Sequence, residues 1–507
     1  GYDRFSLQTL YVFALNYILG VGVLGMPYAF SQAGFLLCSI IIISVSIISF
    51  ITVMWVLEAC ERYEASKRLH ADAQPTESTM ILRSKGSDAS CTSIDRHRYE
   101  VVDLIAHFLG PLHNHVYSSS LMALMFIGLL AYTQVFCGAF GALVWGNDSE
   151  STIWGLGQFC FAIVVLPLST IELDEQVEVQ SILSAARFLA IFVMVAGSVV
   201  ALILDDQVHQ KDIDLPTSDA HCESMFTSCF SGFGVAFSTA LFSQLFQHSI
   251  PGLVRPLRAQ EDRLSKVPSI FAASLLTTCS FYLLLGMTAA SYFRGDTKSS
   301  VNLNFAGFLF GLDPTSTHGG LLLLVRCAAN VVVVFPALDT ISVFPLIANT
   351  LGNNFYASTS RTMVKWISCR LMEYGLCKEA YSRPDSANRR YSDLSSQDRS
   401  AVMKRASQLS TLFWRMVAAV PPLVASLWVS DLSFSLLLAG VAGVYVAFFA
   451  PAFLQLASGG SGVFERTRFH GWYSNRLLVA PVMAFATFSL GMVLIQIVGA
   501  VHHLYET

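Results

Sequence analysis

Eleven apolar segments, each long enough to cross a lipid bilayer, constrain the fold of this chain more than any other feature. A spanning helix needs about 20 residues, and the segments that reach this length are residues 8–30, 34–57, 117–145, 152–171, 180–204, 227–253, 268–290, 320–347, 409–429, 432–456 and 477–500. Apolar residues make up 54% of the chain, charged residues make up 13%, and the mean hydropathy is +0.55. We therefore expect an all-α polytopic membrane protein with eleven transmembrane helices.

The basic residues divide unevenly between the two sides of these spans. With the N-terminus in the cytosol, only Lys211, Arg294 and Lys298 of the 31 Lys and Arg residues fall in outer loops. The positive-inside rule describes this asymmetry. We expect a cytosolic N-terminus, an extracytosolic C-terminus and no cleaved signal peptide, because the first span is too long and no small-residue cleavage site follows it.

The alternation of spans and loops gives the domain organisation. We expect spans 1–2 in residues 1–57, a cytosolic linker with an amphipathic segment in 58–116, spans 3–5 in 117–204, an outer loop in 205–226, spans 6–8 with an outer loop (291–319) in 227–347, a basic cytosolic loop in 348–408, spans 9–11 in 409–500 and an outer tail in 501–507. The polar stretch 60–98 is typical of a flexible linker. The basic loop is a candidate site for a cytosolic partner, and its Tyr391-Ser392-Asp393-Leu394 fits a tyrosine-based endosomal sorting signal. Both the plasma membrane and an endolysosomal membrane therefore stay open.

The first span contains residues that interrupt helices. Gly20, Gly22, Gly25 and Pro27 lie close together in it; glycine offers no side chain for packing, and proline lacks a backbone donor. A freed backbone group in hydrocarbon is costly, so a break persists only where protein or a polar cavity meets it. This pattern favours the broken helix of a secondary transporter, whose exposed backbone binds substrate near the midplane. A glycine face for close helix packing is the alternative.

The sixth span ends in polar residues beside a Pro-Gly pair. Gln247, His248 and Ser249 come just before Pro251 and Gly252. A second discontinuous helix would bring free backbone groups together with an imidazole that changes charge near neutral pH, which suits proton coupling. The alternative is that the span ends at Gln247 and His248 lies at the membrane interface.

The eighth span carries oxygen-bearing side chains after a proline. Asp339, Thr340 and Ser342 follow Pro336. Oxygen ligands beside a freed carbonyl suit a hard cation, and a carboxylate that carries a proton would serve equally. If the span ends early, Asp339 lies at the inner surface.

Three arginines fall within spans, and we expect none of them to bind substrate. Arg415 lies near an inner end and can extend its head group to the membrane surface. Arg187 can do the same, or it can face the core and pair with Glu172 or Asp174. Arg326 lies nearer the outer end of its span.

Two features of the outer segments predict modification. Asn147-Asp148-Ser149 is a glycosylation sequon at Asn147 on the expected outer side. Cys222 and Cys229 flank the end of the outer segment 205–226 and could form a disulfide in an oxidising compartment. The other cysteines show no metal-ligand spacing, and we expect no cofactor.

The sequence lacks the motifs of soluble catalysis. It has no phosphate-binding glycine loop, no HExxH and no nucleophile elbow. Basic runs occur only in inner loops, so nucleic-acid binding has no support. We expect no enzyme.

Several motifs, in order along the chain, resemble those of a transporter family. Residues 16–30, followed by Gln32-Ala33-Gly34, resemble the first-helix signature of the amino acid/auxin permease group. Within that group, the chain resembles the transmembrane protein 104 family at Gln247-His248-Ser249-Ile250-Pro251, Phe293-Arg294-Gly295-Asp296, Leu303-Asn304-Phe305, Val420-Pro421-Pro422 and Pro451-Ala452-Phe453-Leu454.

The resemblance implies a 5+5 inverted-repeat fold, as in the leucine transporter, with helices 1 and 6 discontinuous and the eleventh peripheral. The substrate-binding residues that it implies are Asn16, Gly20, Val21, Gly22, Val23, Gly25, Phe246, Gln247, His248 and Ser249. The ion-coupling candidates are Asn16, His248, Asp339, Thr340 and Ser342. Related sodium-coupled members hold an ion near the positions of Asn16, Thr340 and Ser342, whereas Asp339 departs from the pattern and favours proton coupling.

The leading hypothesis from the sequence is a secondary active transporter of small neutral amino acids, coupled to protons or sodium and working by alternating access. The second is a sensor that binds a metabolite in the same cavity and signals through its cytosolic loops without transporting it. The third is a membrane scaffold, for which intact first and sixth helices would be the sign.

Overall fold

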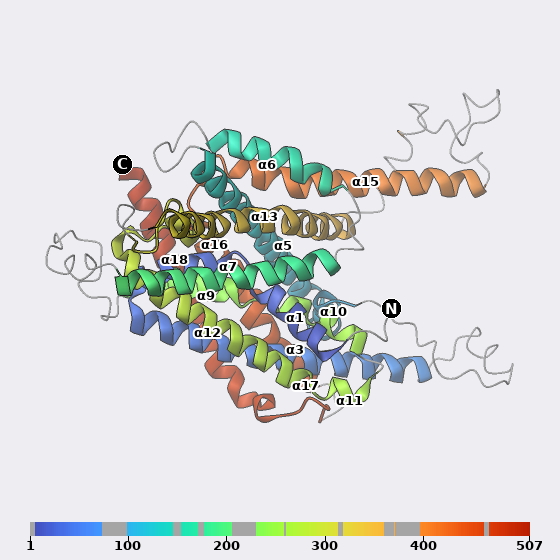
Figure 1. Cartoon of the computed structure of the whole chain (residues 1–507). Helices are drawn as coiled ribbons and strands as arrows, with labels where there is room; N and C mark the ends of the chain where they lie inside the picture. The colour runs from blue at the N-terminus through green and yellow to red at the C-terminus, as the bar shows by residue number, and fades with distance from the viewer. Residues whose placement is uncertain are drawn as a thin grey trace, which may run out of the picture. The chain divides into compact units, whose positions relative to one another are not determined.

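The computed structural model describes residues 6–73, 99–144, 154–170, 177–204, 230–257, 260–312, 318–358, 370, 396–460 and 466–506. Within these ranges the regular structure is helical, with no strand (Figure 1). The principal helices are α1 (Leu7–Ile18), α2 (Gly22–Ala33), α3 (Phe35–Ala73), α5 (Val101–Val144), α6 (Trp154–Leu168), α7 (Val177–Leu204), α9 (Phe233–Ser243), α10 (Ile250–Val254), α11 (Glu261–Leu264), α12 (Val267–Phe293), α13 (Gly319–Ser358), α15 (Ser396–Ala425), α16 (Leu432–Val444), α17 (Ala450–Gly459) and α18 (Val479–Glu506).

Long apolar helices dominate the described part of the chain. Seven helical stretches are long and apolar enough to span a membrane, and the bent α1–α2 pair makes eight if it counts as one span. The other expected spans coincide with α6, which is shorter, with the interrupted α9–α10, and with α15. The protein is therefore polytopic, and the number eleven stays a prediction.

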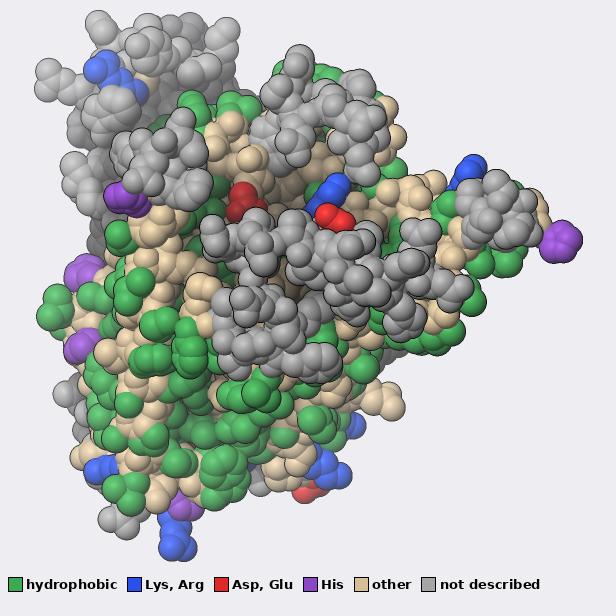
Figure 2. Space-filling model, turned by 90° about the vertical axis from the view of Figure 1, so that its left-hand side faces the viewer, with side chains coloured by type: hydrophobic (Ala, Val, Ile, Leu, Met, Phe, Trp, Pro, Cys, Tyr) green, Lys and Arg blue, Asp and Glu red, His purple; other side chains and the backbone are tan. Residues whose placement is uncertain are grey.

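Apolar side chains also cover surface that faces outward. On α3, Leu36, Ile40, Ile43 and Ile47 recur every three or four residues and are 43–58% exposed. Residues with this spacing share one face of a helix, and such a face suits lipid. Figure 2 likewise shows hydrophobic side chains over much of the surface that the described residues present there.

The chain divides into two compact units, each built from segments far apart in sequence. The first comprises Gly1–Leu124, Glu178–Val333 and Asp431–Thr507, and the second comprises Met125–Val177 and Val334–Ser430. The second unit thus contains most of the third expected span, the fourth, the second half of the eighth and the ninth, and the first unit contains the rest.

In the first unit, the short helices α2 and α9 lie at the centre of the packing. Helix α2 packs against α9 and α12, and α9 packs against α3, α16 and α18. Most of α2 and α9 is buried, with Met26, Ala29, Phe237 and Leu241 at 0% exposure. The connections that precede α2 and follow α9 are also mostly buried, as Leu19, Val21 and residues 244–247 show.

Two helices extend beyond the spans expected from hydropathy. Helix α3 continues to Ala73, although the sequence analysis begins the cytosolic segment at residue 58, and α13 continues to Ser358, past the expected end at 347. A hydropathy window stops where apolar residues stop, whereas a helix continues while its backbone bonds and side-chain contacts persist. In α5, Gly110 has a φ of 82°, so the amphipathic stretch before Pro111 forms a separate helical arm.

The second unit is held by side chains that bond to helix ends. Gln134 donates from Nε2 to the carbonyl oxygen of Val429 at 2.8 Å, and Gln158 donates to that of Ser426 at 3.1 Å. Phe161 is fully buried and stacks on Phe136 with ring centres 4.5 Å apart. These contacts join α5 and α6 to the end of α15 within this unit.

Candidate functional site

The first expected span is broken in the middle. Helix α1 ends at Ile18, α2 begins at Gly22, and the two axes meet at a bend of 54°. Leu19 closes α1 with its N–H bonded to the Leu15 carbonyl at 2.7 Å, and Gly20 bonds back to Ile18 at 2.9 Å. The break lies where the glycines predicted it.

The glycines of α2 also allow close packing, which was the alternative interpretation. A Cβ on Gly22 would overlap the Ser243 hydroxyl at the end of α9, and a Cβ on Gly25 would lie 2.8 Å from Leu436 Cδ1. Gly22 and Gly25 therefore contribute close contacts as well as a break. The α2 N-terminus has no side-chain cap and no acidic residue in its first turn, which leaves the positive end of its dipole uncompensated by side chains.

The sixth expected span is interrupted as well, a few residues before its Pro-Gly pair. Helix α9 ends at Ser243, a short 3-10 turn covers Gln247–Ser249, and α10 begins at Ile250. Helix α9 thus stops four residues before Gln247, and the position of His248 relative to the membrane interface stays a prediction.

Gln247 holds this break in place. It is 1% exposed; its Oε1 accepts from the N–H of Phe246 at 3.0 Å, and its Nε2 donates to Thr52 Oγ1 on α3 at 3.2 Å. Both ends of the amide therefore have protein partners. The next residue differs, because His248 is half-buried and its Nδ1 is buried with no hydrogen-bond partner among the described residues.

Gln244 is a polar residue at the break that the sequence analysis did not select. It follows the last residue of α9 and is 0% exposed, and neither its Nε2 nor its Oε1 has a partner within the ranges that the structure describes. The Nδ2 of Asn16, near the end of α1, is buried and unpartnered in the same sense. A glutamine three residues before Gln247, in a span that should be apolar, is the signal that could have identified Gln244.

Two further residues close the carbonyl ends at the breaks. Arg187 of α7 is 7% exposed, and its Nη1 donates to the carbonyl of Asn16 at 3.3 Å and to that of Leu19. The hydroxyl of Tyr282 on α12, fully buried, lies 3.1 Å from the carbonyl of Ile18 and 2.9 Å from that of Ser243. Tyr282 thus links the end of α1 to the end of α9.

The position of Arg187 decides between the alternatives for this residue. Its side chain faces the protein interior and contacts the first break instead of extending to the membrane surface. The proposed partners Glu172 and Asp174 lie outside the described residues.

The oxygen-bearing residues of the eighth span belong to the second compact unit. Asp339 is 5% exposed and Thr340 is fully buried, both within α13, while Ser342 is half-buried. Thr340 donates from Oγ1 to the Ala337 carbonyl at 2.8 Å. Helix α13 continues well beyond Asp339, and the proximity of these residues to the two breaks stays a prediction.

The remaining candidates cannot be placed. Asn147, Cys222 and Cys229 lie outside the described residues, as do Tyr391 and its neighbours. In the part of the chain that is described, no group of three His, Cys, Asp or Glu side chains could hold a metal ion.

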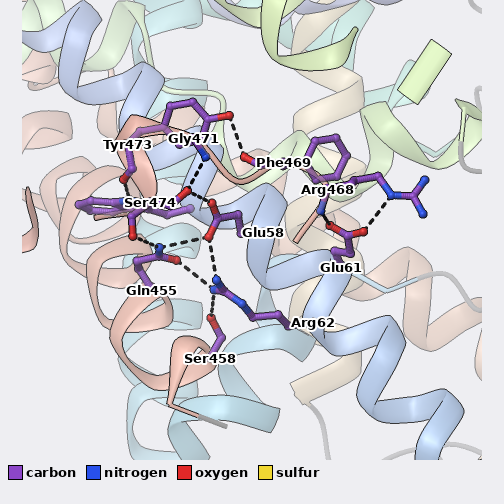
Figure 3. Close-up of polar contacts among 11 residues, drawn as sticks. Glu58, Glu61, Arg62, Gln455, Ser458, Arg468, Phe469, Gly471, Tyr473 and Ser474 are labelled. Atoms are coloured by element: carbon purple, nitrogen blue, oxygen red, sulfur yellow. Dashed lines mark hydrogen bonds and ion pairs between the residues drawn. The ribbon is translucent and has the colours of Figure 1, made fainter. Parts of the chain in front are cut away.

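A second group of buried polar side chains joins α3 to α17 and to the turn at residues 471–474 (Figure 3). Glu58 is 0% exposed; its carboxylate accepts from Arg62 Nη2 at 2.8 Å, from Gln455 Nε2 at 3.2 Å and from the Ser474 hydroxyl. Arg62 also donates to Gln455 Oε1 at 3.1 Å and to Ser458 Oγ at 2.9 Å. Because so many partners compensate the buried charges, the cluster fixes these three segments to one another.

A surface ion pair lies one turn away on α3. Glu61 accepts from the backbone N–H of Arg468 at 2.8 Å and from its Nε at 2.9 Å, and the Arg468 and Glu61 side chains are 42% and 24% exposed. The buried cluster was not predicted, because Glu58 and Arg62 come at the start of a polar segment. An acid and a base four residues apart, directly after an apolar run, are the signal that could have found it.

Comparison with known protein families identifies the family of this chain. A model of the family described as transmembrane amino acid transporter protein matches residues 4–501. The chain belongs to this family.

Relatives of the chain agree with the sequence motifs. A transmembrane protein 104 homolog of Caenorhabditis elegans is 22% identical over 97% of this chain and 96% of its own length. Transmembrane protein 104 of Homo sapiens is 25% identical over 70% of this chain and 75% of its own length. The homolog of Dictyostelium discoideum is 23% identical, and the match spans 58% of its length. The resemblance to the transmembrane protein 104 family is thereby confirmed.

A solved structure is similar at low sequence identity. The crystal structure of MhsT in complex with L-phenylalanine has 11% identity and a TM-score of 0.48, over 97% of this chain and 98% of that one.

Proposed function

We propose that this protein is a secondary active transporter of small neutral amino acids that works by alternating access. The observation that carries the proposal is a pair of broken helices whose ends meet at Tyr282 and at the Gly22–Ser243 contact. Buried polar atoms without protein partners among the described residues lie at both breaks: Nδ2 of Asn16, both amide atoms of Gln244 and Nδ1 of His248. Unpaired buried polar atoms are costly, and a polar solute would pair with them.

The chemistry of these groups fits a zwitterion. The N-terminus of α2, without a side-chain cap, would receive the carboxylate, because helix N-termini attract anions. The Gln244 amide offers an oxygen acceptor for the ammonium group and an N–H donor for a carboxylate oxygen. Val21, Val23 and Phe246, all buried, would provide apolar surroundings for a small neutral side chain. Gly20, Gly22, Gly25, Gln247 and Ser249 would shape the backbone around it.

The composition of the two units supports the proposed 5+5 repeat. A shift of five spans exchanges the third with the eighth and the fourth with the ninth, so it maps the second unit of the chain onto itself. Inverted repeats of this kind underlie alternating access in transporters. We propose His248 and Asp339 as proton carriers, and Asn16, Thr340 and Ser342 as the alternative sodium ligands.

Uptake into liposomes tests the proposed function. The purified full chain, reconstituted into liposomes, should accumulate a labelled small neutral amino acid under a proton gradient, a sodium gradient or both, while protein-free liposomes should not. A panel of neutral, acidic and basic amino acids would define the preference. No uptake of any of them under either gradient would overturn the proposal, and binding without uptake would favour the sensor instead. A membrane scaffold would be expected to have intact first and sixth helices, whereas both are interrupted here.

A further inference from the structure

The carbonyl end of α1 needs positive charge or hydrogen-bond donors. The last carbonyls of a helix have no partner within it, and they carry the negative end of the helix dipole. The last turn of α1 contains no basic residue. Because the helix stops inside an apolar span, its carbonyls cannot rely on bulk water. In a transporter, a bound metal cation is one way to satisfy such a group of carbonyls.

Arg187 supplies this charge from another helix. Its guanidinium donates to the carbonyls of Asn16 and Leu19, on either side of the last residue of α1. A guanidinium carries its positive charge throughout the physiological pH range, and it is covalently attached to the chain, whereas a sodium ion would bind and dissociate. The Tyr282 hydroxyl lies within hydrogen-bond distance of the Ile18 carbonyl, which is between those of Asn16 and Leu19 in the chain.

We propose that Arg187 is the resident cation of the first break, and that this protein therefore moves its substrate without sodium. The inference rests on the proposed function and narrows its choice of coupling ion by excluding sodium. Two positive charges within a few ångströms repel each other strongly in a site of low dielectric constant. A sodium ion at the carbonyls of Asn16 and Leu19 would have to displace the guanidinium into an apolar interior. The sodium ligand set expected around Asn16 is thus replaced by an arginine contact.

Replacement of sodium in the uptake assay tests the inference on the wild-type protein. With the same proton gradient, uptake should be unchanged when choline replaces sodium on both sides of the membrane. A decrease of about tenfold or more, the difference that a lost coupling ion produces, would overturn the inference while leaving the proposed function standing.

A stability measurement separates the two proposals if no uptake is found. Any ion that binds the native state stabilises it by mass action. The melting temperature of the purified wild-type protein should be the same in sodium chloride and in choline chloride. A higher melting temperature in sodium alone would overturn the inference, whether or not the protein transports.

Variants of Arg187 test whether the charge of this residue makes the protein independent of sodium. Arg187→Gln removes the charge and should lose uptake in choline, with sodium raising its melting temperature. Arg187→Lys keeps a charge and should remain sodium-independent. Tyr282→Phe is the matched control, because it removes the neighbouring donor but leaves the charge; it should also remain independent of sodium. If Arg187→Gln is as active and as stable in choline as the wild type, the inference is overturned. If that variant does not fold, the wild-type and Arg187→Lys measurements decide.

Discussion

Two glutamines three residues apart in the second break have opposite surroundings, and this contrast gives a prediction. Gln247→Leu removes the bonds to Phe246 and Thr52, so it should lower stability by about 1–3 kcal/mol. Gln244→Leu removes an amide that has no partner in the described structure; it should leave stability unchanged or raised while it abolishes uptake. Melting temperatures and uptake of the two variants, measured side by side, check this. Equal destabilisation by both would contradict the assignment of Gln244 to substrate binding.

His248 and Asp339 are the titratable side chains that we propose for proton coupling. One of the two variants His248→Ala and Asp339→Asn should abolish the pH dependence of uptake, because it removes the group that takes up and releases the proton. The measurement is the initial rate of uptake over a range of external pH at constant membrane potential. If both variants keep the wild-type pH profile, neither residue carries the proton.

At the scale of the helices, the sequence predicted some breaks better than others. The break in the first span lies at Gly20 and next to Gly22, whose lack of a side chain opposes a continuous helix, whereas Pro27 lies inside α2. The second break begins at Gln244, ahead of Pro251, and no glycine or proline marks that position. It is held by Gln247 on Thr52 and by Tyr282 on Ser243, contacts between residues far apart in sequence. A local pattern cannot reveal such contacts, and the same reason explains why the carbonyl partners of Arg187 were not predicted.

The buried cluster on α3 predicts a difference between two neighbouring carboxylates. Glu58→Ala leaves Arg62 charged in a buried site, so it should destabilise the protein by about 3–5 kcal/mol. Glu61→Ala removes a surface ion pair from the same helix and should cost only about 0.2–1 kcal/mol. Thermal unfolding of both variants in the same detergent measures the contrast. A Glu58→Ala protein as stable as Glu61→Ala would show that the cluster does not hold α3 and α17 together.

For the whole molecule, the odd number of expected spans predicts that the two ends lie on opposite sides of the membrane, with the N-terminus in the cytosol by the positive-inside rule. A tag before Gly1 should be accessible from the cytosol only, and a tag after Thr507 from the opposite side only, because eleven crossings reverse the side of the chain. Labelling of intact and permeabilised cells with antibodies against each tag tests this. Both ends on the same side would contradict the eleven-span topology.

The Tyr282 hydroxyl has a mechanical consequence. It carries a single hydrogen, and the oxygens of Ile18 and Ser243 compete for it. If one carbonyl moves away from Tyr282, its hydroxyl can donate to the other carbonyl. The hydroxyl therefore keeps a hydrogen-bond partner in the apolar interior throughout such a movement. The ends of α1 and α9 can thus move relative to each other while Tyr282 stays hydrogen-bonded to one of them.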